Sequence, residues 1–130
     1  MDAATITRQF TLNRQVTGGS TVWTINGQTF DPNNPPMAQV KYGDVERWKF
    51  INPTTHRHPV HIHLIQFQVV EINGVAQDPS TRGWKDVLVA PPNGNITVAA
   101  RFTGYKGRFL FHCYNLEHED LGMMSDFEVL

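Results

Sequence analysis

The chain has 130 residues, of which 40% are hydrophobic and 11% aromatic, a composition that allows one buried core and excludes a disordered protein. The formal net charge is -1 and the Lys and Arg residues form no basic stripe, so we expect no nucleic acid as a partner. No apolar run approaches the roughly 18 residues of a membrane-spanning helix, so we expect no membrane association either. Residues 1–5 lack the basic and apolar regions of a secretory signal, which leaves the compartment open.

In chain order, the apolar pattern predicts short β-strands throughout and at most one helical turn, at Asn115–Glu119. The expected strands are Ile6–Leu12, Thr21–Ile25, Val45–Ile51, Ile62–Ile72, Lys85–Val89, Asn95–Phe102, Arg108–His112 and Phe127–Leu130. Asn-Gly pairs between them tolerate the positive φ values that tight hairpin turns require. About eight strands punctuated in this way predict an all-β Greek-key sandwich, and we expect one domain over residues 1–130. The three tryptophans are expected in or near its core: Trp23, Trp48 and Trp84.

The chain has one cysteine, Cys113, and therefore forms no internal disulfide. A lone cysteine is usually a small buried hydrophobe, but the neighbours of Cys113 indicate a different role. Four of the six histidines lie from His56 to His63, and the other two, His112 and His118, lie close to Cys113. The histidines therefore gather in two segments instead of being scattered along the chain.

The spacing around Cys113 is typical of a copper site. A cysteine at a strand end, a histidine five positions later and a methionine ten positions later can converge if the chain between them forms a tight loop. Blue-copper sites use two imidazoles and one thiolate with a weak axial thioether. His58, at the end of another strand, is the natural second imidazole, and Met124 is an alternative to Met123 as the axial ligand. The predicted type 1 copper ligands are His58, Cys113, His118 and Met123.

Strand alternation predicts the faces on which these residues lie. In the strand around Arg108–His112, Phe111 and Cys113 share one face and His112 lies on the other. Cys113 is therefore expected to face the apolar interior, where a thiolate bound to a metal is kept away from water. His61 and His63 are two residues apart and are expected to share a face as well.

These segments resemble the C-terminal cupredoxin domain of bacterial multicopper oxidases, which are laccase-like enzymes. Two motifs carry the resemblance: His58-Pro59-Val60-His61-Ile62-His63, and His112-Cys113-Tyr114-Asn115-Leu116-Glu117-His118 continuing to Met123. The resemblance covers most of the chain, and it implies a cupredoxin-like fold with type 1 copper ligands at the four positions named above. Members of this family are often periplasmic or extracellular.

The resemblance also implies a second metal site, which this chain carries only in part. In the family, further histidines hold a trinuclear copper cluster that reduces dioxygen to water. His61 corresponds to a type 2 ligand, and His63 and His112 correspond to type 3 ligands. The sequence departs from the pattern at Tyr114, where the family has a histidine, and no His-x-His pair precedes His56. We therefore expect the three histidines to form an incomplete Cu or Zn site or to be surface residues, and this chain alone not to reduce dioxygen.

Three functional interpretations follow, and no catalytic residue or organic cofactor is assigned in the favoured one. The favoured interpretation is one-electron transfer by one type 1 copper per chain, with a redox partner protein or a small electron donor or acceptor and without enzymatic activity in the isolated domain. The first alternative is an oligomeric copper enzyme, oxidase-like or nitrite-reductase-like, with an additional type 2-like copper at His61, His63 and His112. The second is a redox-inactive structural remnant or an engineered fragment of a multicopper oxidase. A homo-oligomer through the face of His61, His63 and Tyr114 is expected if other domains once covered it.

Overall fold

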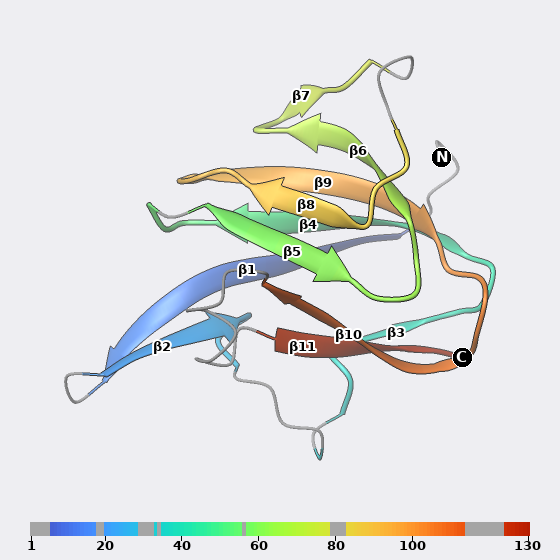
Figure 1. Cartoon of the computed structure of the whole chain (residues 1–130), viewed down its shortest axis with the longest axis horizontal. Helices are drawn as coiled ribbons and strands as arrows, with labels where there is room; N and C mark the ends of the chain where they lie inside the picture. The colour runs from blue at the N-terminus through green and yellow to red at the C-terminus, as the bar shows by residue number, and fades with distance from the viewer. Residues whose placement is uncertain are drawn as a thin grey trace.

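The computed structural model describes residues 6–17, 20–28, 33, 35–55, 57–78, 83–113 and 124–130, and these form eleven β-strands in two sheets (Figure 1). The six-stranded sheet has the order β2-β1-β4-β9-β6-β7. Its strands are β1 (Ile6–Thr17), β2 (Ser20–Ile25), β4 (Val45–Asn52), β6 (Phe67–Ile72), β7 (Val75–Ala76) and β9 (Gly94–Arg101). The five-stranded sheet has the order β3-β11-β10-β5-β8. Its strands are β3 (Ala38–Val40), β5 (His58–Ile62), β8 (Val87–Ala90), β10 (Gly107–Cys113) and β11 (Met124–Val129).

The pairing within the sheets is mixed. β1 pairs with β4, and β3 with β11, in parallel, while β10 pairs antiparallel with both β11 and β5. The expectation of an all-β sandwich is confirmed, with three strands more than the eight predicted. One is β5, which ends where the predicted strand Ile62–Ile72 begins. The other two, β3 and β7, have only three and two residues. Segments this short show too little alternation to be recognised from the sequence.

The predicted single strand Ile62–Ile72 is wrong. Strand β5 ends at Ile62 and β6 begins only at Phe67, and the two strands belong to different sheets. Leu64 has a φ of 79°, a left-handed conformation that a strand does not accommodate, so the chain leaves the five-stranded sheet at this point. Leu64 and Ile65 both contact the core, and the apolar pattern therefore continues through the crossover and hides it.

Aromatic side chains from both sheets form the centre of the core around Trp48, which is 1% exposed. The centroid of its ring lies 4.9 Å from that of Phe10, 5.3 Å from that of Phe127 and 5.6 Å from that of Phe111. These separations lie in the favourable range for aromatic pairs. Since β1 and β4 belong to one sheet and β10 and β11 to the other, the cluster holds the two layers together.

The predictions for the other two tryptophans, Trp84 and Trp23, have different outcomes. The prediction for Trp84 is wrong, because its side chain is 55% exposed. Trp84 precedes β8 and lines an open pocket together with Leu64 and Arg101 instead of packing in the core. The backbone of Trp23 lies in β2, but its side chain lies outside the described part of the chain.

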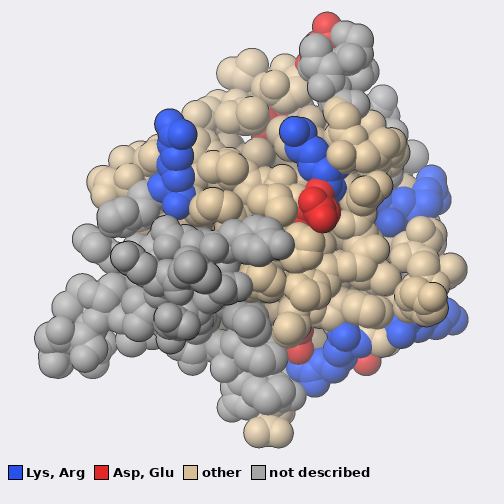
Figure 2. Space-filling view, in the orientation of Figure 1, with Lys and Arg blue, Asp and Glu red and all other residues tan. Residues whose placement is uncertain are grey.

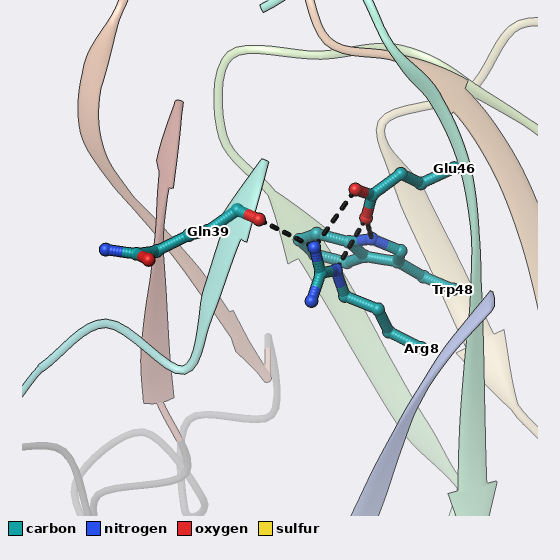
Figure 3. Close-up of polar contacts among 4 residues, drawn as sticks. All are labelled: Arg8, Gln39, Glu46 and Trp48. Carbon is teal, nitrogen blue, oxygen red and sulfur yellow. Dashed lines mark hydrogen bonds and ion pairs between the residues drawn. The ribbon is translucent and has the colours of Figure 1, made fainter. Parts of the chain in front are cut away.

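A partly buried ion pair within the six-stranded sheet, near the start of β4, is connected to the other sheet by one further hydrogen bond (Figure 3). Arg8 donates from Nε to Glu46 Oε1 at 2.7 Å and from Nη2 to Glu46 Oε2 at 3.1 Å. Trp48 Nε1 donates to Glu46 Oε1 at 2.9 Å, and Arg8 Nη2 also donates to the carbonyl oxygen of Gln39 in β3 at 2.6 Å. Glu46 is 1% exposed, so these donors offset the cost of burying its charge. We refer to Arg8, Gln39, Glu46 and Trp48 as the Glu46 network.

The surface agrees with the balanced composition. On the face shown in Figure 2, the Lys and Arg side chains of the described residues stand apart from one another. The described residues on this face therefore form no continuous basic stripe. The described part of the chain also contains no helix with the length and apolar character of a membrane span.

Candidate metal centre

His58 begins β5, and its imidazole is completely buried inside the sandwich. Val60 and Ile62 are buried on the same face of the strand. Pro59 restricts the preceding residue to extended backbone, which favours the start of a strand at His58. The first predicted copper ligand thus lies on the inner face, at the end of the sandwich where β4 and β8 also end (Figure 1).

Two polar residues hold the ring of His58. Thr54 Oγ1 lies 3.0 Å from His58 Nε2 and 2.6 Å from Asn52 Oδ1. Asn52 Oδ1 also accepts a hydrogen bond from the backbone N–H of Thr54 at 3.0 Å. Asn52 Nδ2 donates to the carbonyl oxygens of Ala90 and Pro91 at 3.3 and 3.1 Å. We refer to Asn52, Thr54 and His58 as the Asn52 network, which connects the end of β4 with the end of β8 and the start of β5.

Sequence reasoning missed Asn52 and Thr54. Both side chains are buried, at 0% and 7% exposure, although both are polar. The signal in the sequence is weak, because an Asn and a Thr after an apolar strand are ordinary turn residues. Their position six and four residues before His58 becomes informative only when the turn is seen to fold back onto the imidazole. A further bond from the N–H of Asn93 to the carbonyl oxygen of Thr54, at 2.8 Å, fixes this turn.

Cys113 is the last residue of β10, and the register places it beside His58. Cys113 is directly opposite Val60 in β5, and His58 lies two residues from Val60 on the same face. Diagonal neighbours of this kind are about 7–8 Å apart, which long side chains or a shared ligand can span. Phe111, two residues before Cys113, is completely buried, so Cys113 has an inner-face position in the strand. The side chain of Cys113 itself lies outside the described part of the chain.

The remaining predicted type 1 ligands, His118 and Met123, lie outside the described residues, as does Tyr114. The residues that flank this segment are Cys113 at the end of β10 and Met124 at the start of β11. Met124 pairs with His112, so both flanking residues lie at the same end of neighbouring strands. The assignments of His118 and Met123 as copper ligands therefore stay predictions.

His61, His63 and His112 lie together on the outer face of the five-stranded sheet, as strand alternation predicts. His61 and His112 are directly opposite each other in the register of β5 and β10. The ring centroids of His61 and His63 are 4.7 Å apart, and His63 Nε2 lies 3.0 Å from His112 Nε2. Two nitrogens bound to one zinc ion at about 2.0–2.1 Å would lie roughly 3.3 Å apart, so this pair has nearly the spacing of a shared metal. His61 Nδ1 donates to the carbonyl oxygen of Asp86 at 3.1 Å, which directs its other nitrogen away from that carbonyl.

The outer-face imidazoles also influence one another electrostatically. Burial lowers the pKa of His63 below its ordinary value of 6.5, and the charges of His61 and His112 lower it further. A lowered pKa keeps the imidazole neutral near pH 7, and the neutral form is the one that binds metals. Within the described ranges, no group of three or more His, Cys, Asp or Glu side chains converges as a metal site. The facing pair His63 and His112 therefore supplies two imidazoles, fewer than the ligands that a metal site requires.

Comparison with known proteins places this geometry in one family. The model of the multicopper oxidase family matches residues 4–130. The chain is 36% identical to a laccase of Haloferax volcanii over 97% of its length and 40% identical to a bilirubin oxidase of Albifimbria verrucaria over 92%. It spans only 22% and 21%, respectively, of the length of these curated relatives.

Solved structures agree with the sequence comparison. A multicopper oxidase of Campylobacter jejuni superimposes with a TM-score of 0.85 at 28% identity, covering 99% of this chain and 31% of that protein. McoA, a multicopper oxidase of Aquifex aeolicus, superimposes in its 2F4 variant with a TM-score of 0.81 at 34% identity. That superposition covers 98% of this chain and 30% of the McoA chain.

Proposed function

This chain belongs to the multicopper oxidase family, and on that premise we propose that it is a type 1 (blue) copper protein that transfers single electrons. Copper and oxidoreductase chemistry come with the family, and the fold is its cupredoxin-like sandwich. We assign one type 1 copper to four ligands: His58, Cys113, His118 and Met123. Its electrons would be exchanged with a redox partner protein or a small electron donor or acceptor.

The observation that carries the proposal is the buried imidazole of His58 beside the strand end of Cys113. An imidazole at 0% exposure, held by a hydrogen bond and diagonal in register to the only cysteine, supports a metal ligand over a surface histidine. The described residues fit copper in this respect, because a neutral imidazole and a thiolate are two of the three strong donors of a blue-copper site.

The chain's own residues would support electron transfer by keeping the copper ligands in fixed positions. When bound, copper supplies a one-electron couple between Cu(I) and Cu(II). The Asn52 network fixes the imidazole of His58, and β10 and β5 fix the backbone of Cys113 against Val60. Phe111 and Val60, at 0% and 1% exposure, exclude water from the inner face next to this strand end. Ligands held in this way need little rearrangement when the charge of the site changes.

The outer-face histidines support a second candidate function. The 3.0 Å separation of the Nε2 atoms of His63 and His112 favours a second Cu or Zn ion between them, with His61 beside it. We propose that such a site becomes complete only when another copy of the chain, or another domain, covers this face together with Tyr114. A homo-oligomer through this face would then be the enzyme-like form of the protein, oxidase-like or nitrite-reductase-like.

The proposed function is tested by titrating the reduced, metal-free chain with Cu(II) while recording visible absorption and metal content. We expect an intense blue thiolate-to-copper band that saturates at one copper per chain and is absent from the Cys113→Ser variant. A folded wild-type chain that binds copper without this band would overturn the proposal.

His63→Ala is the matched variant for the second candidate. It should keep the blue band and lose any second, colourless copper. Light scattering at high protein concentration should show dimers or trimers of the wild-type chain and monomers of the His63→Ala variant. A wild-type chain that stays monomeric and holds a single copper would rule out the second candidate.

A further inference from the structure

The side-chain amide of Asn52 has its orientation fixed by backbone groups. Its Nδ2 faces two carbonyl oxygens, of Ala90 and Pro91, at 3.3 and 3.1 Å, and these can only accept hydrogen bonds. Its Oδ1 faces the backbone N–H of Thr54 at 3.0 Å, which can only donate. The oxygen and nitrogen of this amide are therefore unambiguous, and Oδ1 acts purely as an acceptor.

This orientation determines where the hydroxyl proton of Thr54 lies. Thr54 Oγ1 is 2.6 Å from Asn52 Oδ1, and a hydrogen bond between these two oxygens needs the one proton that the hydroxyl owns. The lone pairs of the hydroxyl are left for His58 Nε2, which lies 3.0 Å away. Nε2 must then carry the hydrogen, and in a neutral imidazole the remaining nitrogen, Nδ1, carries the lone pair.

We propose that Asn52 and Thr54 are positioning residues that fix the tautomer of His58, so that Nδ1 and not Nε2 is the nitrogen offered to a metal. The proposal rests on the proposed function in one respect, namely that His58 is a ligand. It goes further by naming the two residues that select the tautomer of His58. Nothing in the copper motifs themselves contains this information, because Asn52 and Thr54 precede them in the chain.

The hydrogen bonds of the Asn52 network hold the imidazole ring of His58 in one orientation, in addition to the packing of its side chains. Asn52 ends a strand of the six-stranded sheet, while Ala90 and His58 belong to the five-stranded sheet, so the chain of hydrogen bonds crosses between the layers. The turn that carries Thr54 is itself tied to Asn93 at 2.8 Å. A partner that orients a metal-binding imidazole typically changes metal affinity by about 10–100-fold when it is removed.

The tautomer can be measured in the wild-type chain without copper. Two-bond ¹H–¹⁵N correlation spectra of the metal-free protein distinguish a ring nitrogen that carries hydrogen from one that carries a lone pair. We expect His58 to show hydrogen on Nε2 and a lone pair on Nδ1. A hydrogen on Nδ1 would overturn the proposal, and this result needs no variant to fold.

Three variants then separate positioning from packing. Thr54→Val keeps the shape of the side chain but removes the hydroxyl, and we expect a mixed tautomer of His58 and a copper(II) affinity at least about tenfold lower. Thr54→Ser keeps the hydroxyl and should restore both. Thr24→Val is the matched control, because Thr24 is 1% exposed and its hydroxyl has no hydrogen-bond partner among the described residues. A folded Thr54→Val chain that retains the wild-type tautomer and copper affinity would contradict the proposal.

The copper titration keeps this inference distinct from the proposed function. Hydrogen on Nε2 of His58 in a chain that never turns blue would support the positioning role and overturn the copper function. A blue chain whose metal-free form has hydrogen on Nδ1 of His58 would support the copper function and overturn the positioning role.

Discussion

Strand β4 begins at one buried polar network and ends at another, and the two networks are built differently. In the Glu46 network, the donors of Arg8 and Trp48 converge on one carboxylate, so these hydrogen bonds end on a single charged group (Figure 3). In the Asn52 network, neutral groups are arranged in a line that ends on the imidazole of His58. Both join the two sheets, but only the second ends on a group that can donate with one atom and bind a metal with another. Variants at the start of β4 should therefore change mainly the stability of the chain, and variants at its end mainly the positioning of His58.

The largest expected effect on stability comes from opening the Glu46 network. Arg8→Met leaves the buried carboxylate of Glu46 without its charged partner, and we expect the free energy of unfolding to fall by about 3 kcal/mol. Urea denaturation of the metal-free chain measures this. Arg101→Met, which removes an exposed bond to the carbonyl oxygen of Gly43, is the control and should cost less than about 1 kcal/mol. If Arg8→Met also weakened copper binding about tenfold in a folded chain, the two networks would not be independent.

Opening the Asn52 network should have a smaller effect on stability and a larger one on copper. Thr54→Val removes the hydroxyl's bonds to Asn52 and His58, and we expect a loss of about 1–2 kcal/mol in the same urea experiment. Copper(II) affinity, measured by competition with a chelator, should nevertheless fall in this variant and stay at the wild-type value in Arg8→Met. A stability loss in Thr54→Val as large as that of Arg8→Met would mean that the Asn52 network is mainly structural.

Acidification should act on the outer face, through His63. The pKa of His63 is lowered in the folded chain, mainly by burial, so the unfolded chain binds a proton more readily. Stability contributed by His63 is therefore present above about pH 6.5 and is lost as the pH falls through the lower folded pKa. His63→Gln should make the free energy of unfolding of the metal-free chain less dependent on pH in this window. An unchanged pH dependence in that variant would exclude His63 as its source.

The smallest expected effect concerns a buried hydroxyl that belongs to neither network. Thr24 is 1% exposed and its Oγ1 makes no hydrogen bond to any described residue, so burying it brings a desolvation cost without a compensating bond. Thr24→Val should leave the melting temperature unchanged or raise it by a few degrees. Calorimetry of the metal-free chain measures this, and a clear fall in melting temperature would show that the hydroxyl has a partner.

The sequence predicts the parts of this molecule that follow from local pattern. Alternation along Arg108–His112 correctly predicts a buried Phe111 and the opposite face for His112, because side chains in a strand have a strict period of two. The same logic fails at Leu64, where a left-handed residue breaks the strand while the apolar pattern continues. Trp84 is predicted in or near the core because it is a large aromatic residue, but no feature of the neighbouring sequence indicates that it lies exposed at an open pocket.

The residues of the candidate site also differ in whether local sequence pattern predicts them. His58, His61, His63, His112 and Cys113 could be singled out because their residue types are unusual and their spacing is fixed by short strands. Asn52 and Thr54 could not, because their role depends on a turn that brings common polar residues onto one nitrogen of a distant ring. Such contacts depend on tertiary structure, and no periodicity in the sequence encodes them.

We propose that the first copper binds inside the sandwich, at His58 and Cys113, before any metal binds on the outer face. An EPR spectrum of the chain loaded with one equivalent of Cu(II) tests it most directly. We predict the narrow copper hyperfine splitting of a strongly covalent copper–thiolate bond, lost in Cys113→Ser and retained in His63→Ala. A wide splitting typical of copper bound by nitrogen alone, retained in Cys113→Ser and lost in His63→Ala, would contradict the claim and place the metal on the outer face.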